Sequence, residues 1–269
     1  RGRKGRSACP RYQRRYSKML SLYDANGLVH WTERDIRVRE SAITHLSAEV
    51  SAALRTTNPA WDIRRVEAPL LVPRALISDA YTDADVFVQQ RMSEPDHDLV
   101  LRPDTPPSTY AYMSHLLSTR AKTRLPLCVW QAGKSFRREQ DQPSKQVRLK
   151  EFWQMEFQCA YAADTANDYH AAILEPVRRM LAAVTRLPTR IVPSDRLPAY
   201  SEITMDVEVD NGDKWMEVAS ISRRTDFPTS VTMTGKSGPR QIAVKVLEIA
   251  IGLDRCVYNW SIADEREPA

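Results

Sequence analysis

Glycine is scarce in this chain, with eight residues among 269. Neither G-x-G-x-x-G nor G-x-x-x-x-G-K-[ST] occurs, which excludes the dinucleotide fingerprint and the P-loop as ways of holding phosphates. No run of about 18 apolar residues exists, so no membrane-spanning helix is expected. The first residues are basic and lack the apolar stretch of a secretory signal.

Cysteine is also sparse, and its spacing excludes two kinds of site. The four cysteines form no C-x-x-C pair, and none lies at metal-ligand spacing from a histidine. Structural zinc and a disulfide framework are therefore not expected. A reducing, cytoplasmic setting fits this pattern best.

Positive charge is in modest excess and gathers at the start of the chain. The formal net charge is +5 and the pI is about 9.0. Basic residues interleaved with Tyr12 and Tyr16 crowd the first 18 positions. Two interpretations stay open: an arm that neutralises phosphates or a solvated tail. We predict a basic arm over residues 1–20 and one domain over residues 21–269.

Apolar periodicity predicts helices over residues 39–56, 109–119 and 166–186, and a final helix that begins after Gly252. Strands are predicted over 63–72, where Pro69 implies an edge strand, over 125–132, closed by Gly133, and over 152–161 and 241–250. Alternation from Ile203 to Ile221 around the turn residues 210–213 predicts a hairpin. We interpret residues 134–150 as a mobile loop. Consecutive strands without regular crossover helices indicate an α+β fold, a mostly antiparallel sheet flanked by helices.

One predicted pair of strands carries residues suited to a nucleotide. Arg137, Glu139 and Phe152 would lie near one another if the segments on either side of the loop pair antiparallel. A guanidinium clamps phosphate, an aromatic face stacks adenine, and a carboxylate accepts from its exocyclic amine. Composition alone favours the other interpretation, a surface hairpin with ordinary ion pairs.

Three stretches, in order, resemble the motifs of class II aminoacyl-tRNA synthetases. Phe136-Arg137-Arg138-Glu139, the loop and Phe152 resemble motif 2. The stretch 246–255, which ends in Arg255, resembles motif 3, and 65–73 resembles motif 1, whose proline lies at the dimer interface of that family. The resemblance covers residues 40 to 260 and implies an ATP-dependent ligase and a homodimer.

Further stretches resemble glycyl-tRNA synthetases in particular. Leu101-Arg102-Pro103-Asp104-Thr105 is similar to their Leu-Arg-Pro-Glu-Thr, and 151–156 to their Glu-Phe-Thr-x-x-Glu. Trp215-Met216-Glu217 followed by Arg224-Thr225-Asp226-Phe227 is similar to their Trp-x-Glu and Arg-Thr-Asp-Phe. Since 14 residues follow Arg255, we expect the family's anticodon-binding domain to be missing.

The resemblance implies a role for each matching residue. Arg137 would hold the α-phosphate of ATP, Glu139 and Phe152 would seat adenine, and Arg255 would reach the γ-phosphate. Glu248 would bind Mg²⁺. The remaining implied roles concern the amino acid: an ammonium pit formed by Asp104 and Glu156 with Glu248 near its rim, carboxylate positioning by Arg102, and further substrate contacts from Glu217 and Ala250.

Two departures bear on the amino acid. The Glu-Pro-Ser of motif 3 in glycyl-tRNA synthetases reads Glu248-Ile249-Ala250 here, and their pit glutamate is Asp104. Loss of the serine hydroxyl removes one hydrogen bond and frees volume. We expect an enlarged pit that accepts glycine or another small amino acid, with alanine and serine as alternatives.

Three functions follow as hypotheses. The first is amino-acid activation through an aminoacyl adenylate with transfer to an acceptor, above all nucleic acid, either a tRNA acceptor end or a modified DNA base. A carrier protein or a small molecule is a further possible acceptor. The second is charging of tRNA by reading only the acceptor stem. The third is a non-catalytic module that binds nucleic acid or serves a polymerase, which is ranked last because Arg137, Glu139, Phe152, Glu248 and Arg255 are all retained.

Overall fold

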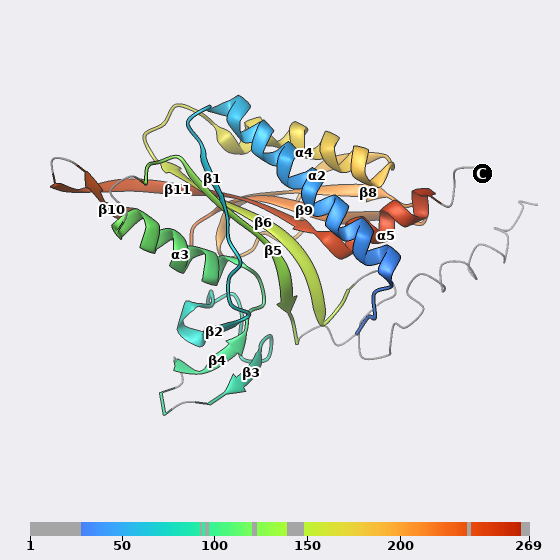
Figure 1. Cartoon of the computed structure of the whole chain (residues 1–269), viewed down its shortest axis with the longest axis horizontal. Coiled ribbons are helices and arrows are strands. Elements are labelled where there is room, and N and C mark those ends of the chain that lie inside the picture. Colours follow the sequence, from blue (N-terminus) through green and yellow to red (C-terminus); the bar gives the residue numbers. More distant parts are fainter. Residues whose placement is uncertain are drawn as a thin grey trace, which may run out of the picture.

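A long, mostly antiparallel sheet forms the centre of the molecule (Figure 1). The computed structural model describes residues 28–91, 93–94, 97–119, 123–138, 148–235 and 238–264. The predicted basic arm and Glu139 lie outside these ranges. In spatial order the strands are β1 (Asp62–Arg65), β5 (Leu127–Phe136), β6 (Glu151–Ala162), β11 (Gly238–Gly252), β9 (Trp215–Arg224), β8 (Ser201–Asp210) and β7 (Thr189–Pro193), and β10 (Ser230–Gly235) pairs with β11.

All of these strand pairs are antiparallel except β1 with β5. The hairpin predicted from residue 203 to 221 is confirmed as β8 and β9, and its turn contains Gly212 at φ 87°. That left-handed conformation suits glycine because it has no Cβ.

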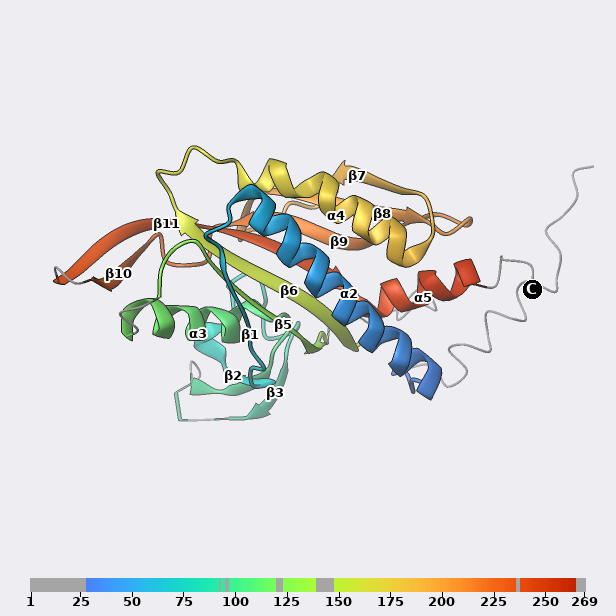
Figure 2. The ribbon, with the colours of Figure 1, turned by 45° about the horizontal axis from the view of Figure 1, so that its top comes forward.

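Helices lie on both faces of this sheet (Figure 2). One face carries α2 (Glu33–Thr57), α4 (Tyr169–Thr185) and α5 (Leu253–Asp264), which contact one another. The opposite face carries α3 (Pro106–Thr119), which packs against β5, β6 and β10. The predicted helices over 39–56, 109–119 and 166–186 are thus confirmed with shifted ends, and the α+β fold with a mostly antiparallel sheet is confirmed.

The longest helix shows how the sequence sets one of these elements. Thr32 accepts a hydrogen bond from the backbone of Asp35, and Asp35 accepts one from the backbone of Thr32, which forms a capping box. Leu46, Val50 and Leu54 are fully buried at helical spacing and face the sheet. None of the described helices is long and apolar enough to cross a membrane.

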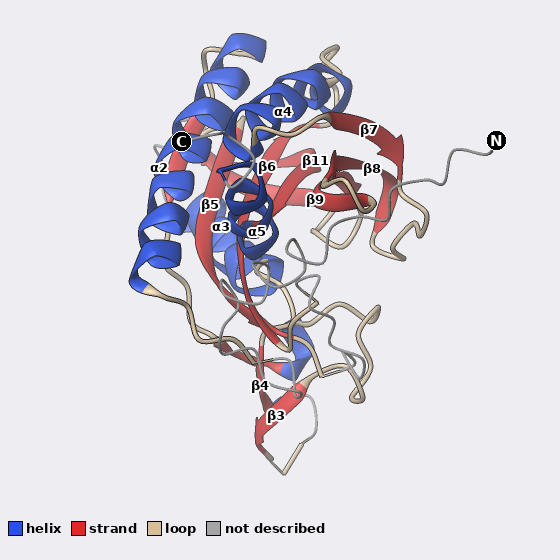
Figure 3. Ribbon diagram, turned by 90° about the vertical axis from the view of Figure 1, so that its right-hand side faces the viewer, coloured by secondary structure: helices blue, strands red, loops and turns tan. Residues whose placement is uncertain are grey.

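A smaller sheet lies beyond one end of the main sheet (Figure 3). Its strands are β2 (Leu71–Pro73), β4 (Leu99–Leu101) and β3 (Phe87–Gln90), with a 3₁₀ turn η1 (Arg74–Leu76) after β2. The single strand predicted over 63–72 is therefore wrong: it is divided between β1 and β2, because Pro69 cannot donate to a ladder.

Alternation along the central strands gives the sheet two chemically different faces. On β6, Met155, Phe157 and Cys159 belong to the core beneath α2, α4 and α5. Gln154, Glu156 and Gln158 alternate with them and point to the other face. On β11 the same period places Leu247, Ile249 and Ile251 in the core and Glu248 and Ala250 opposite.

Gly133 differs from its predicted role as the end of a strand. It lies inside β5, opposite Gln154 of β6, and the ladder continues to Phe136. A Cβ at this position would come within 2.6 Å of Arg102 Nη2. Glycine is required here for close approach of a buried guanidinium, and the predicted loop begins only after Phe136. Residues 139–147 of that loop lie outside the described ranges.

Candidate functional site

A cavity opens on the face of the sheet that carries the polar residues. It holds about 770 Å³, counted out to its open mouth, and its walls come from β6, β9, β11, the start of α5 and the segments around β5. Clefts lined by converging polar groups are where small molecules bind. Eight of the residues predicted to form the site line it: Asp104, Arg137, Phe152, Glu156, Glu217, Glu248, Ala250 and Arg255.

Register explains why residues distant in sequence meet there. Glu156 of β6 is paired with Ala250 of β11, and Ala250 is paired in turn with Ser220 of β9. Glu248 lies two residues earlier on β11, on the same face. One set of ladders therefore fixes the floor of the cavity.

Arg137 and Phe152 lie together, as predicted from the sequence. The guanidinium carbon of Arg137 is 5.3 Å from the centre of the Phe152 ring. Its Nε donates to the carbonyl of Pro103 (3.1 Å) and its Nη2 to the hydroxyl of Tyr81 (3.2 Å). These bonds hold a half-buried cation beside an aromatic face, which is an arrangement suited to a phosphate and a purine.

Arg255 supplies a second guanidinium from the first turn of α5. Its Nη1 donates to the carbonyl of Glu217 (2.9 Å) and lies 3.3 Å from the Glu217 carboxylate. Glu217, predicted to touch the substrate, is thus paired with Arg255 in this structure and lies half-exposed in the cavity wall.

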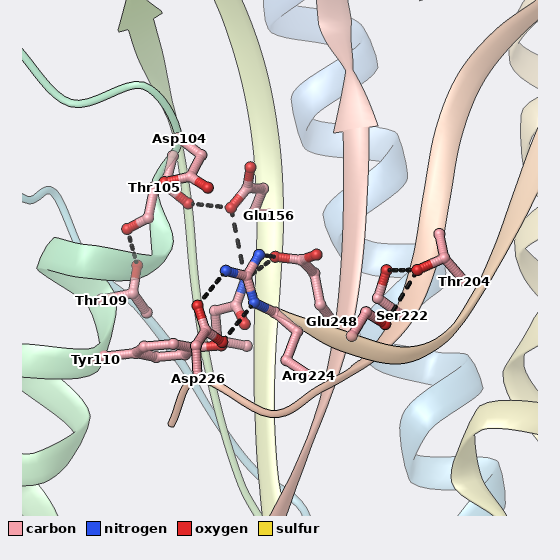
Figure 4. Close-up of polar contacts among 12 residues, drawn as sticks. Asp104, Thr105, Thr109, Tyr110, Glu156, Thr204, Ser222, Arg224, Asp226 and Glu248 are labelled. Carbon is pink, nitrogen blue, oxygen red and sulfur yellow. Dashed lines mark hydrogen bonds and ion pairs between the residues drawn. The ribbon is translucent and has the colours of Figure 1, made fainter. Parts of the chain in front are cut away.

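Three predicted carboxyl groups converge in a buried pit, shown in Figure 4. Asp104 is 4% exposed, and Glu156 and Glu248 are 3% exposed. The hydroxyl of Thr105 donates to Glu156 Oε2 at 2.6 Å, and Gln158 Nε2 donates to Glu248 Oε1 at 2.7 Å. Asp104 Oδ2 accepts from the Tyr81 hydroxyl (3.2 Å), whereas its Oδ1 is buried without a hydrogen-bond partner. An orphaned carboxylate oxygen is costly and indicates a place for a donor.

The pit carries more carboxyl groups than nearby cations neutralise. Burial, followed by the charges of Glu248 and Asp104, raises the pKa of Glu156 to about 8. Burial also raises the pKa values of Asp104 and Glu248, although Arg224 opposes this most strongly in both cases. A cation that enters the pit would relieve this burial cost.

Arg224 is the central cation of the pit, and no role was predicted for it from the sequence. Its side chain is 2% exposed; Nη1 donates to Glu248 Oε1 at 2.8 Å, and Nε donates to Asp226 Oδ1 at 2.9 Å. Its guanidinium carbon lies 3.8 Å from the centre of the Tyr200 ring. The Arg-Thr-Asp-Phe stretch marked the segment, but only the tertiary structure shows that its arginine enters the pit.

Asp254 is another wall residue that sequence reasoning missed as part of the site. Its Oδ2 accepts from the backbone of Trp153 at 2.8 Å, and its Oδ1 is buried without a partner. Burial raises its pKa to about 7, opposed by the bond from Trp153 and by Arg39. This carboxyl fixes the start of α5, and hence Arg255, against β6.

The role predicted for Arg102 is not supported by its position. Arg102 does not line the cavity; it is 1% exposed and packs over Gly133 of β5, on the same face of the sheet as Glu156. Its Nη1 donates to Gln131 Oε1 at 2.7 Å, and its Nε donates to the carbonyl of Lys134 at 3.0 Å. These bonds hold the guanidinium among protein acceptors, so Arg102 braces the segment before α3 against β5.

Glu248 alone does not make a metal centre. Its Oε1 already accepts from Arg224 and Gln158. Among the described residues, no group of three or more histidine, cysteine, aspartate or glutamate side chains is arranged to hold a metal ion. The residues present do not fit a Mg²⁺ ion bound by protein ligands alone.

Comparison with known proteins identifies the family of this chain. Residues 87–259 match the family model described as the tRNA synthetase class II core domain (G, H, P, S and T). A glycine–tRNA ligase of Mycolicibacterium paratuberculosis is 29% identical over 137 residues, which cover 48% of this chain and 29% of that protein. A glycine–tRNA ligase of Mycoplasma capricolum is 28% identical over 195 residues, which cover 66% of this chain and 42% of that protein. The chain thus spans less than half the length of these relatives.

Two solved structures share the fold. A prolyl-tRNA synthetase of Cryptosporidium parvum, complexed with halofuginone and AMPPNP, superposes with a TM-score of 0.70 at 15% identity, over 93% of this chain and 52% of its own. A Giardia lamblia prolyl-tRNA synthetase in complex with prolyl-adenylate gives 0.69 at 17% identity, over 91% and 51%.

Proposed function

Because the chain belongs to the class II tRNA synthetase core-domain family, we propose that it activates an amino acid with ATP and passes it to an acceptor. One observation carries this proposal: two guanidinium groups, Arg137 and Arg255, line the same cavity as a buried acidic pit. The guanidinium groups can bind the phosphates of ATP, and the carboxyl groups can bind the ammonium group of an amino acid.

In this proposal the substrate carboxylate attacks the α-phosphorus of ATP, pyrophosphate leaves, and an aminoacyl adenylate forms. Arg137 stabilises the charge that develops on the α-phosphate, and Arg255 holds the γ-phosphate side. Phe152 stacks on adenine, and Glu139 accepts from its amine. No general base is needed because the nucleophile is already ionised, so the rate comes from positioning and charge stabilisation.

The ammonium group of the substrate binds in the pit. Asp104 Oδ1, buried and without a partner, supports this assignment, as do the raised pKa values of all three carboxyl groups. Mg²⁺ remains a prediction from the family resemblance, and in this structure Glu248 is bonded to Arg224.

Ala250 bears on the choice of amino acid. Its methyl group lies in the cavity wall, paired with Glu156 and Ser220. We propose that the site accepts glycine or a small homologue, with alanine and serine as the first candidates. One methylene group changes discrimination by only about 1–3 kcal/mol. Exchange measured with all twenty amino acids checks this, and strict glycine preference would refute an enlarged pit.

A nucleic acid is the acceptor that we propose, and the names of the relatives, glycine–tRNA ligases, favour a tRNA acceptor end over a modified DNA base. Transfer of radiolabelled amino acid to total tRNA, to DNA and to protein separates these acceptors. Deletion of residues 1–20 should weaken nucleic-acid binding and lower its salt dependence if the arm neutralises phosphates.

We also propose a homodimer, in a cytoplasmic setting. Leu70 and Leu71, beside the motif 1 proline, are 39% and 45% exposed, and the nearby β1 is an edge strand of the main sheet. Sedimentation of wild type and Leu71→Asp tests this: both sedimenting as monomers would contradict it.

ATP–pyrophosphate exchange is the test of the activity itself. The wild-type chain should exchange only in the presence of an amino acid. Arg137→Ala should abolish exchange, whereas Arg138→Ala, an exposed neighbour that does not line the cavity, should retain it. Failure of the wild type with every amino acid would favour the non-catalytic binding module. Wild-type exchange by both Arg137→Ala and Arg138→Ala would show that Arg137 does not belong to the site.

A further inference from the structure

The pit contains four carboxyl groups close to the buried guanidinium of Arg224. Asp104, Glu156, Glu248 and Asp226 surround Arg224 (Figure 4), which bonds directly to Glu248 and Asp226. Glu156 has no bond to Arg224, and its direct partners are the Thr105 hydroxyl at 2.6 Å and the Gln158 amide at 3.5 Å. Glu156 and Asp104 are therefore the two carboxyl groups of this set that have no directly bonded cation.

Thr105 is held rigidly in front of Glu156. Thr105 is fully buried immediately before α3. Its carbonyl accepts from Thr109 N (3.2 Å) and from Thr109 Oγ1 (3.0 Å). Gln131 Nε2 donates to Thr109 Oγ1 at 2.6 Å, and Gln131 Oε1 accepts from Arg102. A continuous buried network thus runs from Arg102 to the Thr105 hydroxyl.

We infer that Thr105 is a positioning residue that directs Glu156 to exchange its proton for the ammonium group of the substrate. This inference rests on the proposed function and deepens it. In the empty pit Glu156 is a neutral carboxylic acid. When the amine enters as an ammonium ion, the Glu156 O–H bond breaks, the proton leaves to solvent, and the carboxylate pairs with the ammonium group. The charge of the pit stays constant, and one proton is released for each substrate bound.

The charged groups that face Glu156 come from every element around it. Glu248 on β11 and Asp104 before α3 disfavour its ionisation, Arg224 on β9 favours it, and the Thr105 hydroxyl also lowers the pKa. Arg102, which packs over β5 on the same face of the sheet, interacts with its charge as well. Removal of the hydroxyl removes one of the few stabilising contacts of the carboxylate, so deprotonation should then need a higher pH.

The experiment uses the full chain and the amino acid that supports pyrophosphate exchange best. Between about pH 6.5 and 8, KM for the amino acid should fall up to about tenfold per pH unit, as expected for release of one proton, while KM for ATP does not follow that slope. Thr105→Val should move the break in the plot of KM against pH to higher pH and raise KM for the amino acid several-fold at pH 7. Thr105→Ser should restore the wild-type KM and the wild-type break.

Thr204→Val is the matched control. Thr204 is also buried, and its hydroxyl bonds Ser201 and Ser222, with no carboxylate (Figure 4). Its profile should match that of the wild type. A flat wild-type profile, or Thr105→Val and Thr204→Val profiles that coincide, would overturn the inference while the exchange activity itself stands.

Calorimetry tests the proton without turnover. Alanine or glycine is titrated at pH 7 into the chain with a non-hydrolysable ATP analogue, in phosphate and in Tris buffer. The difference in heat gives the protons released: about one for the wild type, and none for lactate, whose hydroxyl replaces the amine. Amino-acid binding without proton release would refute the exchange. No exchange activity together with one proton released would reject the proposed function alone.

Discussion

Replacement of Arg224 by methionine should be among the most destabilising single changes in the described part of the chain. Counted over side chains alone, Arg224 is 2% exposed and Glu248 is 4% exposed, with Nη1 and Oε1 separated by 2.8 Å. Methionine fills much of the same volume but leaves Glu248 and Asp226 without their shared cation. A buried charge that loses its partner costs about 3–5 kcal/mol.

A double-mutant cycle isolates the electrostatic part of that cost. Glu248→Gln replaces the carboxylate by a neutral amide of the same shape. On that background, Arg224→Met should lower the free energy of unfolding by at least about 1 kcal/mol less than it does in the wild type. Residues in contact couple by about 0.5–3 kcal/mol. Urea unfolding at one pH, with m-values compared between variants, measures each free energy of unfolding. A cost below about 1 kcal/mol for Arg224→Met, or strict additivity, would refute the reasoning.

Three further changes test other parts of the structure. Burial beside Glu248 and Asp104 raises the pKa of Glu156 from 4.5 to about 8. Because the folded chain keeps a proton that the unfolded chain releases, the free energy of unfolding should fall as pH rises between these values. Urea unfolding of Glu156→Gln should show about 2 kcal/mol less of that fall between pH 5 and 7. Gly133→Ala should destabilise by about 1–3 kcal/mol in the same assay, because its Cβ meets Arg102 Nη2 at 2.6 Å, whereas Gly252→Ala, with a nearest contact of 3.5 Å, should cost less. Thr32→Ala should cost about 1 kcal/mol through loss of the capping box, and an unchanged melting temperature would contradict that cap.

The long elements were predictable because their patterns repeat. Leu46, Val50 and Leu54 identify α2 at helical spacing, and alternation around Gly212 identifies the hairpin of β8 and β9. Strands β2, β3, β4 and β7 contain three to five residues each. So few residues show no clear periodicity, and these strands were not predicted as separate elements.

The site was predictable only where a motif named its residues. Asp104, Glu156 and Glu248 came from stretches that resemble the family, and they do lie together in the pit. Arg224 lay inside such a stretch, but its entry into the pit follows from the register of β9 against β11, which a linear sequence does not reveal. Arg102 shows the opposite case: its motif matched, yet its side chain is buried and does not line the cavity.

The two-faced sheet restricts how this site can evolve. Glu248 and Ala250 share a face only because one residue separates them on β11, and Ile249 between them belongs to the core. Insertion or deletion of one residue there would drive acids into the hydrophobic layer and turn isoleucine toward the ligand. New ligand preferences of this cavity must therefore arise by exchange of single side chains, while length variation is confined to the connecting loops.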